Sequence, residues 1–311
     1  MNQQANHISK EAKIAVLLGG QSKERDVSLT TGKAIAKALM DLGYSNVHQI
    51  DPSEIPNFYE QYWDVVFIAL HGAWGEDGGV QKILQDHHIA FTGSRAESSA
   101  LAMSKFDSKV VFKQHDIPTL PFLISTAADD FDTWKQHVTT TLTYPIIGKP
   151  DCEGSSIGME IVKNQAQLYD AFTRTHSFGQ RVLWENYLTD GIDLTVGILL
   201  GEALPVVEIR PKNGIYDYAA KYTKGMTDYY CPARINQALA EKIQNYALQA
   251  FTAIGCRSWG RVDFIWKDEQ VYCLEINTIP GMTPTSLVPM AAKEKGLAFE
   301  ALVEAIVLDA I

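Results

Sequence analysis

Apolar residues in the first hundred positions of the chain follow two alternating patterns. Continuous apolar runs such as KIAVLLGG at 13–20 are typical of strands buried on both faces. Between such runs, apolar residues recur at the spacing of an amphipathic helix. The predicted elements are strands at 13–20, 46–50 and 64–70 and helices at 28–40 and 79–86. We expect Asp26 or Ser28 to cap the first helix and Gly43 to end it. This order predicts a small doubly wound parallel sheet over residues 1–95.

The middle of the chain, residues 96–187, combines helices with strands that a hairpin connects. A single helix is predicted over SALAMSKFDSKVVFKQH at 99–115. The strands YPIIGKP and GMEIV flank the short loop DCEGSSI, which predicts a hairpin with a Gly/Ser-rich tip. A helix over 164–176 and the strand RVLWENYL complete an antiparallel α+β subdomain.

The last third, residues 188–311, is predicted to form a second α+β subdomain. It contains the hairpin DLTVGILL-GE-ALPVVEI, a polar and tyrosine-rich loop at 212–229, and a long amphipathic helix that begins near Ile235. The strands GRVDFIW and VYCLEIN follow, and helices close the chain. The predicted fold class is therefore α/β, with α+β character in the central part.

Composition and charge narrow the class of protein. Of 311 residues, 46% are hydrophobic and 21% are charged, which is typical of a globular protein and excludes disordered and fibrous chains. The net charge of −10 argues against nucleic acid or an anionic membrane as the main partner, because an acidic surface repels phosphate. The polar N-terminus predicts no signal peptide, and no apolar run is long enough to span a membrane. We therefore expect a cytoplasmic protein.

The cysteines support the same expectation. Cys152, Cys231, Cys256 and Cys273 form no CxxC motif and no pair with a histidine. This spacing argues against a zinc site and against a disulfide framework. We expect reduced thiols that are mostly buried.

The strongest chemical pattern lies in the two predicted strands GRVDFIW and VYCLEIN. Arg261 and Asp263 share one face of the first strand, because side chains alternate along a strand. Glu275 and Asn277 share a face of the second strand. If the strands pair through KDEQ, these faces coincide and their oxygen ligands converge, which suits Mg²⁺ that bridges substrate phosphates. The alternative is the solvated face of an ordinary hairpin.

A second pattern is a lysine followed by a loop of glycine and serine. Lys149 ends a predicted strand, and the loop 153–158 after it offers backbone N–H groups to a phosphate. The alternative is an ordinary hairpin turn. Lys105 could add a second charge, although a single lysine on a helix is usually only solvated. The common nucleotide motifs are missing, since GGQSKE lacks the GxGxxG spacing and Lys33 lacks the flanking residues of a P-loop.

Two further candidates follow strands of the predicted N-terminal sheet. Glu24 comes soon after the first strand, at the edge where such sheets bind ligands, and its carboxylate could hold a substrate ammonium. His71 occupies the equivalent position after the strand at 64–70. For both residues, the alternative is an exposed polar loop.

Together these segments resemble the D-alanine–D-alanine ligases, a family of the ATP-grasp superfamily. The resemblance extends over essentially the whole chain from about residue 13, in the family's order. Its segments are AVLLGGQSKERDVSL, FIALHGAWGEDG, FTGS, IIGKP, EGSSIGM, YDYAAKY, CPA, GRVDF, LEINTIPGMT and SLVPMAA. The resemblance implies an ATP-grasp fold, in which the N-terminal domain 1–95 is followed by subdomains 96–187 and 188–311 that clamp ATP.

The resemblance also implies roles for individual residues. The residues implied to bind ATP are Lys105, Lys149, Glu153, Ser156, Glu185, Tyr187, Leu188, Asp193 and Lys221. Those implied to act in catalysis are Glu24, Ser155, Tyr222, Arg261 and, through its backbone N–H, Gly281. The implied substrate ligands are Glu24, His71, Ser286 and Leu287. The implied metal ligands are Asp263, Glu275 and Asn277.

Two positions depart from the family's pattern. Asp193, which the resemblance places at the ribose, stands where the family usually has Glu. Asp151 and Cys152 precede EGSS, where small or basic residues are more usual. Nothing in the sequence assigns a function to the second departure.

The implied reaction is the ATP-dependent ligation of two D-alanines through D-alanyl phosphate, for the synthesis of peptidoglycan precursors. Two Mg²⁺ ions are implied as cofactors, with Mn²⁺ as a substitute, and a homodimer that associates through the N-terminal region. One alternative is a D-alanine–D-lactate ligase or another ATP-grasp carboxylate–amine ligase. Another is a non-catalytic small-molecule binding protein, which would give no reason for the carboxylates and the arginine of the paired strands to occur together.

Overall fold

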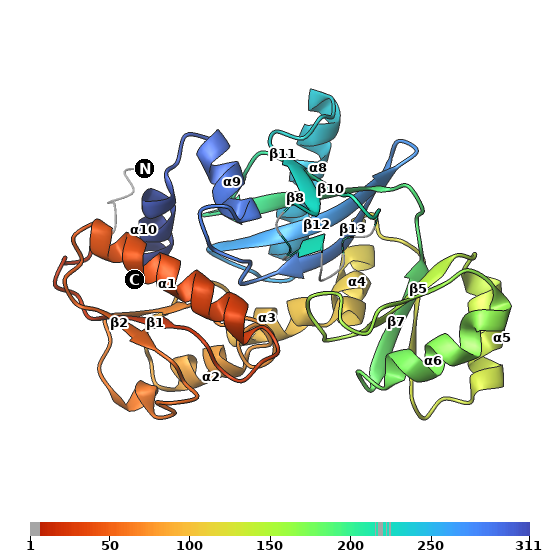
Figure 1. The fold of residues 1–311 in the computed structure, drawn as a ribbon, viewed down its shortest axis with the longest axis horizontal. Coiled ribbons are helices and arrows are strands. Elements are labelled where there is room, and N and C mark those ends of the chain that lie inside the picture. Colours follow the sequence, from red (N-terminus) through yellow and green to blue (C-terminus); the bar gives the residue numbers. More distant parts are fainter. Residues whose placement is uncertain (1–6, 215, 217–219, 222, 224) are drawn as a thin grey trace.

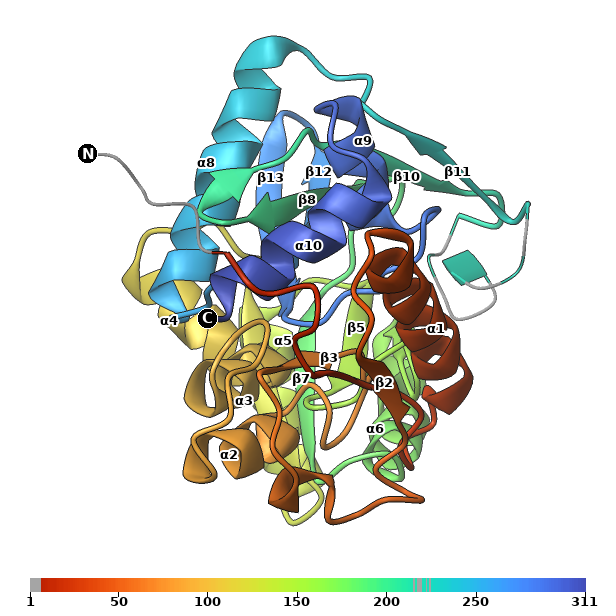
Figure 2. The same cartoon turned by 90° about the vertical axis from the view of Figure 1, so that its left-hand side faces the viewer.

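The computed structural model describes residues 7–214, 216, 220–221, 223 and 225–311. Within these residues the strands form three sheets. Figure 1 shows the N-terminal sheet at the left, the C-terminal sheet in the upper centre and the central sheet at the right. Helices cover the outer faces of all three sheets (Figures 1 and 2).

The N-terminal sheet is parallel, as the sequence predicts. β1 lies between β2 and β3 and pairs with both along its whole length. The sheet lies between α1 on one face and α2 on the other (Figures 1 and 2). Every residue of β1 and β3 is buried, which explains their continuous apolar runs. The elements are β1 (Ile14–Leu17), α1 (Arg25–Asp41), β2 (Val47–Ile50), η1 (Phe58–Glu60), β3 (Val65–Ile68) and α2 (Gly79–Asp86).

The predicted start of α1 is wrong, and the predicted end is confirmed. Glu24 is the N-cap residue, so the helix begins before both Asp26 and Ser28. Ser28 is fully buried, and its hydroxyl donates to Ala69 O (2.7 Å) and accepts from Gly19 N (2.9 Å). It therefore ties the helix to the ends of two strands instead of capping it. Gly43 follows the helix with a left-handed φ of 88°.

The helix predicted over 99–115 is two helices, α3 (Ala96–Met103) and α4 (Lys105–Gln114). The break falls at Ser104, whose backbone is extended (φ −76°, ψ 109°). The Ser104 hydroxyl accepts a hydrogen bond from Asp107 N, which makes it the N-cap of α4. Helical periodicity did not reveal this break because it continues through the two short helices.

The central sheet is antiparallel, in the order β4-β7-β5-β6. The predicted hairpin around the Gly/Ser-rich loop is confirmed as β5 and β6. α5 and α6 cover one face, where Trp134, Phe172 and Trp184 form the core of this part. The elements are β4 (Phe122–Thr126), α5 (Phe131–Thr141), β5 (Ile146–Pro150), β6 (Glu160–Val162), η2 (Gln165–Gln167), α6 (Leu168–His176) and β7 (Arg181–Asn186).

The C-terminal sheet is also antiparallel, in the order β11-β10-β8-β12-β13, and β9 pairs with β8. Its two predicted hairpins are confirmed, with the short β9 inside the first of them. The strands are β8 (Ile192–Leu199), β9 (Glu202–Ala203), β10 (Val207–Pro211), β11 (Thr227–Tyr230), β12 (Trp259–Lys267) and β13 (Gln270–Asn277). The helices are α8 (Gln237–Ala253), α9 (Leu287–Glu294) and α10 (Phe299–Asp309).

Hydrophobic cores connect these parts. One core joins β1 and β3 to Ile306 and its neighbours on α10, which packs beside α1. A second core lies under the C-terminal sheet and includes Phe112 of α4. The helices α3 and α4 therefore pack with the C-terminal sheet, although the division of the sequence groups them with the central strands. The division into 1–95, 96–187 and 188–311 itself stays a prediction.

The cysteines are free thiols, as expected, but they are not mostly buried. Cys273 is buried and Cys152 is exposed, while Cys231 and Cys256 are intermediate. Within the part of the chain that the structure describes, no helix is both long enough and apolar enough to cross a membrane.

Candidate active site

A cavity of about 660 Å³ collects side chains from the central and C-terminal sheets, from α1, and from the loops that follow β1 and β3. It is lined by Glu24, His71, Lys105, Lys149, Glu153, Ser155, Ser156, Glu185, Tyr187, Leu188, Asp193, Lys221, Arg261, Asp263, Glu275, Asn277, Gly281, Ser286 and Leu287. These are the described residues to which the sequence assigned a role. Tyr222, the remaining candidate, lies outside the described residues.

One side of the cavity is the carboxylate wall, which we define as Arg261, Asp263, Glu275 and Asn277. β12 and β13 are antiparallel, with Asp263 opposite Glu275 and Arg261 opposite Asn277, so the predicted convergence of the two faces is confirmed. Arg261 donates from Nε to Asp263 Oδ1 (2.8 Å) and from a terminal nitrogen to Oδ2 (2.7 Å). Burial works to lower the pKa of Arg261, but the adjacent Asp263 carboxylate outweighs it and raises that pKa. Arg261 is therefore a fixed cation beside the carboxylates.

The donor set of this wall fits Mg²⁺. Burial works to raise the pKa of Glu275, but Lys105 and Lys221 are the largest of the positive charges that hold it well below its usual range. Glu275 is thus an ionised carboxylate, and its Oε2 lies 3.5 Å from Lys105 Nζ. The described residues contain no cluster of three or more His, Cys, Asp or Glu side chains that could hold a metal. Two carboxylates and the amide of Asn277 instead suit an ion that completes its coordination with oxygens of a phosphate ligand.

A second group is the lysine wall, which we define as Lys109, Lys149 and Glu185. Lys149 and Glu185 line the cavity, whereas Lys109 is buried and does not. Glu185 is fully buried on β7, with Oε2 2.8 Å from Lys109 Nζ and Oε1 2.5 Å from Lys149 Nζ. Burial works to raise the pKa of Glu185, but the two lysines outweigh it and hold the value at about 2. Two cations then pair with one anion, and Lys149 is the cation of this wall that lines the cavity.

Lys109 is not among the residues that the sequence predicts for the site. It is 1% exposed and also donates to Thr119 Oγ1 at 2.6 Å. Lys105 and Lys109 are four residues apart on α4, so they lie on the same side of the helix. This spacing was the signal that could have pointed to Lys109.

The glycine–serine loop, residues 153–158, connects β5 to β6 beside these walls. Ser155, Ser156 and Gly158 have left-handed φ angles of 50°, 61° and 72°. Turns of this kind gather backbone N–H groups in one concavity that suits an anion. The Ser155 hydroxyl bonds the carboxylate of Glu24, and Ser156 Oγ donates to Tyr216 O at 3.2 Å. The loop is therefore held from two separate parts of the chain.

The two candidates from the N-terminal sheet lie together at the cavity. Glu24 reaches the glycine–serine loop, and His71 is 5% exposed. The His71 ring lies between Thr31 Oγ1 (3.2 Å from Nε2) and Glu76 Oε1 (3.3 Å from Nδ1). Burial raises the pKa of Glu76. The alternative of an exposed polar loop does not hold for His71.

A third edge of the cavity is formed by Tyr187 and Leu188 after β7 and by Asp193 on β8. Burial, together with the charge of Asp263, raises the pKa of Asp193 to about 6. Lys221 also lines the cavity, and burial lowers its pKa.

The start of α9 closes the cavity on the remaining side. Ser286 is the N-cap residue and Leu287 is the first residue of the helix. The Leu287 N–H has no acceptor inside the helix, and the positive end of the helix dipole favours a carboxylate there. Ser286 Oγ accepts from Thr283 N at 3.0 Å, and Gly281 precedes this turn. The arrangement can receive an anion at one end of the cavity while the lysine wall receives another.

Comparisons with known proteins agree with this geometry. Residues 111–308 match the family model described as the D-ala D-ala ligase C-terminus. A D-alanine–D-alanine ligase of Hydrogenovibrio crunogenus is 42% identical over 97% of this chain and 96% of its own length. A D-alanine–D-alanine ligase of Methylacidiphilum infernorum is 45% identical over 94% of this chain and 93% of its own length.

Solved structures are similar over nearly the whole chain as well. The D-alanine–D-alanine ligase of Bacillus anthracis complexed with ATP superposes with a TM-score of 0.82 at 28% identity, and covers 96% of this chain and 97% of its own. The VanG D-Ala:D-Ser ligase of Enterococcus faecalis gives a TM-score of 0.84 at 26% identity, over 97% of this chain and 100% of its own. These similarities confirm the ATP-grasp fold, and the protein belongs to the D-alanine–D-alanine ligase family.

Proposed function

We propose that the protein ligates two D-alanines to D-alanyl-D-alanine and converts ATP to ADP and phosphate. The observation that carries this proposal is the meeting of the lysine wall and the carboxylate wall at one cavity, because it offers one place for phosphates and another for a divalent cation. The relatives that carry the name D-alanine–D-alanine ligase, matched over nearly the full chain, support the choice of substrate.

Ligation requires an activated carboxylate, since a free carboxylate is a poor electrophile. In the proposed sequence the γ-phosphoryl group of ATP passes to the first D-alanine and gives D-alanyl phosphate and ADP. The amine of the second D-alanine then attacks the acyl carbon, and phosphate leaves from a tetrahedral intermediate. Phosphoryl transfer is accelerated mainly by positioning and by neutralising charge. Lys105, Lys149 and Lys221 are placed to do this.

Asp263, Glu275 and Asn277 would hold Mg²⁺, in the proposal two ions, with Mn²⁺ able to replace them. When bound, the metal would supply positive charge that neutralises the negative charge of the phosphates. The remaining charge control comes from the chain itself. Arg261 keeps its guanidinium beside the cavity because Asp263 orients it through two hydrogen bonds.

The oxyanion of the tetrahedral intermediate needs fixed donors. Arg261 and the backbone N–H of Gly281 both line the cavity and are assigned this role. One such donor can contribute about 3–4 kcal/mol to the stability of a transition state.

The two amino acids are assigned to two different groups of residues that line the cavity. Glu24, with Ser155 beside it, would bind the ammonium of the first D-alanine, and His71 lies next to that position. Tyr222 would complete this group but lies outside the described residues. Ser286 and the N–H of Leu287 would bind the carboxylate of the second D-alanine at the start of α9. The nucleotide would lie along Glu185, Tyr187, Leu188 and Asp193, with Glu153 and Ser156 over its phosphates.

Three wider assignments accompany this function as proposals. The dipeptide would serve peptidoglycan precursor synthesis, the protein would act in the cytoplasm where ATP is available, and it would form a homodimer. The similarity to a D-Ala:D-Ser ligase makes the second substrate the point to test first.

The test is release of ADP by the purified protein with ATP and Mg²⁺, across D-alanine, L-alanine, D-serine and D-lactate, with products identified by mass. We expect ADP release to require D-alanine and the product to be D-alanyl-D-alanine. Equal release with L-alanine would contradict the proposal. Predominant formation of a mixed product in competition with D-alanine would replace it with the corresponding D-alanine–D-serine or D-alanine–D-lactate ligase.

A further inference from the structure

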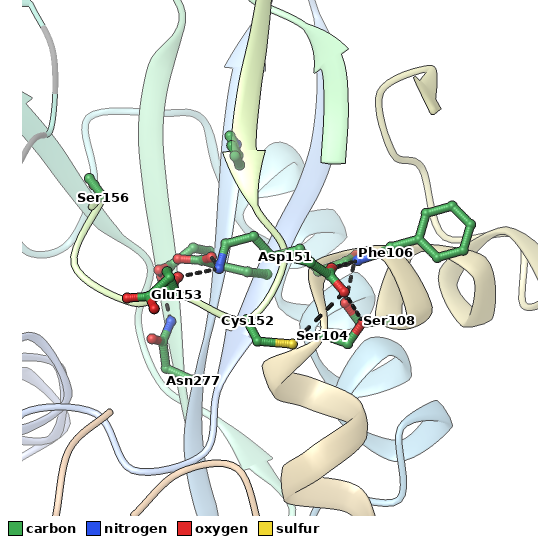
Figure 3. Close-up of polar contacts among 12 residues, drawn as sticks. Ser104, Phe106, Ser108, Asp151, Cys152, Glu153, Ser156 and Asn277 are labelled. Atoms are coloured by element: carbon green, nitrogen blue, oxygen red, sulfur yellow. Dashed lines mark hydrogen bonds and ion pairs between the residues drawn. The ribbon is translucent and has the colours of Figure 1, made fainter. Parts of the chain in front are cut away.

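Asp151 follows β5 directly, and the chemistry described above does not use it. Its side chain is 2% exposed and does not line the cavity. Figure 3 shows the carboxylate of Asp151 turned toward Phe106 and Ser104, on the side away from Glu153. A buried carboxylate in this position must be explained by what it binds.

Asp151 supplies acceptors to the first turn of α4. The first N–H groups of a helix have no acceptor inside it. Lys105 N donates to the backbone oxygen of Asp151 (3.2 Å), and Phe106 N donates to its Oδ1 (2.7 Å). Asp107 N donates to Ser104 Oγ (3.1 Å), and the same hydroxyl lies 2.9 Å from Asp151 Oδ2. Two of these three amides are therefore satisfied by a residue far away in the sequence.

The same residue is anchored in the central sheet. Asp151 N donates to the backbone oxygen of Arg181 on β7 at 3.0 Å, and Arg181 Nε lies 3.5 Å from Asp151 Oδ2. Arg181 also makes two hydrogen bonds of 3.2 Å to Asp107 on α4. We call Ser104, Asp107, Asp151 and Arg181 the α4 joint. Because α4 packs in the core of the C-terminal sheet, the joint connects that core to the central sheet.

Lys105, the first residue of α4, is the residue on which this joint acts. Its ammonium donates to the backbone oxygen of Glu153 at 2.8 Å and lies 3.5 Å from Glu275 Oε2. Lys105 thus lies between the glycine–serine loop and the carboxylate wall, where its backbone is set by Asp151. A shift in the first turn of α4 would move this ammonium relative to both.

We propose that Asp151 is a positioning residue for the phosphates of the nucleotide, acting through Lys105. It fixes the first turn of α4 against the end of β5, so that the Lys105 ammonium and the glycine–serine loop keep one relative position. The inference rests on the proposed function in that it takes ATP as the nucleotide. A helix cap with no further role would change stability and leave nucleotide affinity as it is, and this difference makes the proposal testable.

The test is a double-mutant cycle on the full chain, read by calorimetric binding of ATP with Mg²⁺ and without D-alanine. We expect Asp151→Ala to weaken ATP binding about tenfold and Lys105→Ala to weaken it at least as much. The double variant should bind no more weakly than Lys105→Ala alone, because both changes remove the same interaction. Unchanged affinity in Asp151→Ala, or fully additive losses, would overturn the inference.

A matched control is Asp130→Ala. Asp130 is the exposed N-cap residue of α5, where its carboxylate accepts from Thr133 N (2.9 Å), and it does not line the cavity. It should lose thermal stability and bind ATP as the wild type does. Asp151→Asn retains an acceptor for Phe106 N, so it should bind ATP more tightly than Asp151→Ala and more weakly than the wild type. This variant also keeps the test valid if Asp151→Ala does not fold. Wild-type affinity in Asp151→Asn, with Asp151→Ala unfolded, would also count against the inference.

The two proposals fail in different ways. Wild-type protein that binds no ATP would overturn the proposed function together with this inference. ADP release that requires D-alanine, combined with wild-type ATP affinity in Asp151→Ala, would overturn the role of Asp151 alone. In the Asp151 variants the KM for D-alanine should stay within about twofold of the wild type, because the joint touches neither Glu24 nor α9.

Discussion

The lysine wall and the carboxylate wall bury charged groups in opposite ways. In the lysine wall one carboxylate, Glu185, holds two ammonium groups, whereas in the carboxylate wall Arg261 faces two carboxylates. Each wall neutralises most of its own charge and leaves an excess of one sign, with Lys149 on one side and Glu275 on the other. In the proposed function, this difference gives phosphates and a divalent cation separate places in the same cavity.

The walls also differ in how the chain builds them. The carboxylate wall comes from one hairpin, in which β12 and β13 follow each other directly. The lysine wall joins α4, β5 and β7, which are far apart in the sequence. A local element fixes the first wall, whereas tertiary packing fixes the second. The largest expected effects come from removing one charge from each wall.

The first prediction concerns Glu275→Gln. This change removes the ionised ligand that faces Lys105 and leaves the pairing of Arg261 with Asp263 intact. We expect ADP release at saturating Mg²⁺ to fall by about two to three orders of magnitude, because the charge acts on the transition state. Glu269→Gln, in the exposed turn of the same hairpin, is the control and should leave the rate unchanged. Near-normal turnover in Glu275→Gln would contradict the proposal that the carboxylate wall binds the metal.

The second prediction tests the opposite wall. Lys149→Ala removes the cation that faces the cavity but leaves Glu185 paired with buried Lys109. We expect ATP affinity to fall about tenfold, which corresponds to about 1.4 kcal/mol, while the fold is retained. Calorimetry of ATP binding measures this loss, with Lys163→Ala, an exposed lysine after β6, as the control. Equal affinities in the two variants would contradict the role of Lys149.

How the walls are built also explains what the sequence could predict. The face shared by Asp263 and Glu275 could be predicted from strand alternation on the condition that the two strands pair through KDEQ, and the structure shows this local hairpin. Lys109 could not be paired with Glu185 in this way, because their contact depends on how α4 packs against the central sheet. Glu185 was a candidate only because of the resemblance to a family, and the structure shows that Lys109 and Lys149 are its partners.

The errors have similar causes. The capping rule placed Asp26 or Ser28 at the start of α1, but Glu24 is the N-cap residue, and tertiary hydrogen bonds with Ala69 and Gly19 give Ser28 another role. Helical periodicity joined α3 to α4 because Ser104 interrupts the backbone without interrupting the apolar pattern. Asp151 received no role because its partners lie on a helix distant in the sequence.

The third prediction concerns the glycine–serine loop, which belongs to neither wall. Gly158 has a φ of 72°, and an added Cβ would lie 2.6 Å from the Phe178 ring. Gly158→Ala should lower the free energy of unfolding by about 1–2 kcal/mol and also reduce ADP release several-fold, since the loop must shift. Gly201→Ala has a similar φ of 80° but open space around its Cβ, so it should lose stability only. A Phe178→Ala change added to Gly158→Ala should restore part of the rate. Full activity in Gly158→Ala would contradict a positioned loop.

The last and smallest prediction compares Glu185 with Glu208, a second buried glutamate held by two cations. Glu208 lies on β10, is 1% exposed, does not line the cavity, and bonds Arg210 Nε (2.5 Å) and a terminal nitrogen of Arg234 (2.8 Å). Burial works to raise the pKa of Glu208, but the two arginines outweigh it and hold the value at about 2. Since this pKa is lowered in the folded state, its contribution to stability is complete above the ordinary value of about 4.5 and is lost as the pH falls toward 2.

Glu208→Gln should therefore flatten the dependence of the free energy of unfolding on pH between about 4.5 and 2. It should leave ATP affinity at neutral pH unchanged. Glu185→Gln should flatten the same range, because its pKa is also about 2, but it should weaken ATP binding as well, since Glu185 holds Lys149 in place. Urea unfolding at a series of pH values, combined with calorimetry at neutral pH, measures both quantities. A wild-type pH dependence in Glu208→Gln would show that the arginines do not hold its pKa low. Weakened ATP binding in Glu208→Gln would show that a buried glutamate outside the cavity affects the nucleotide as Glu185 does. The lysine wall would then not differ in function from an ordinary buried cluster of ion pairs.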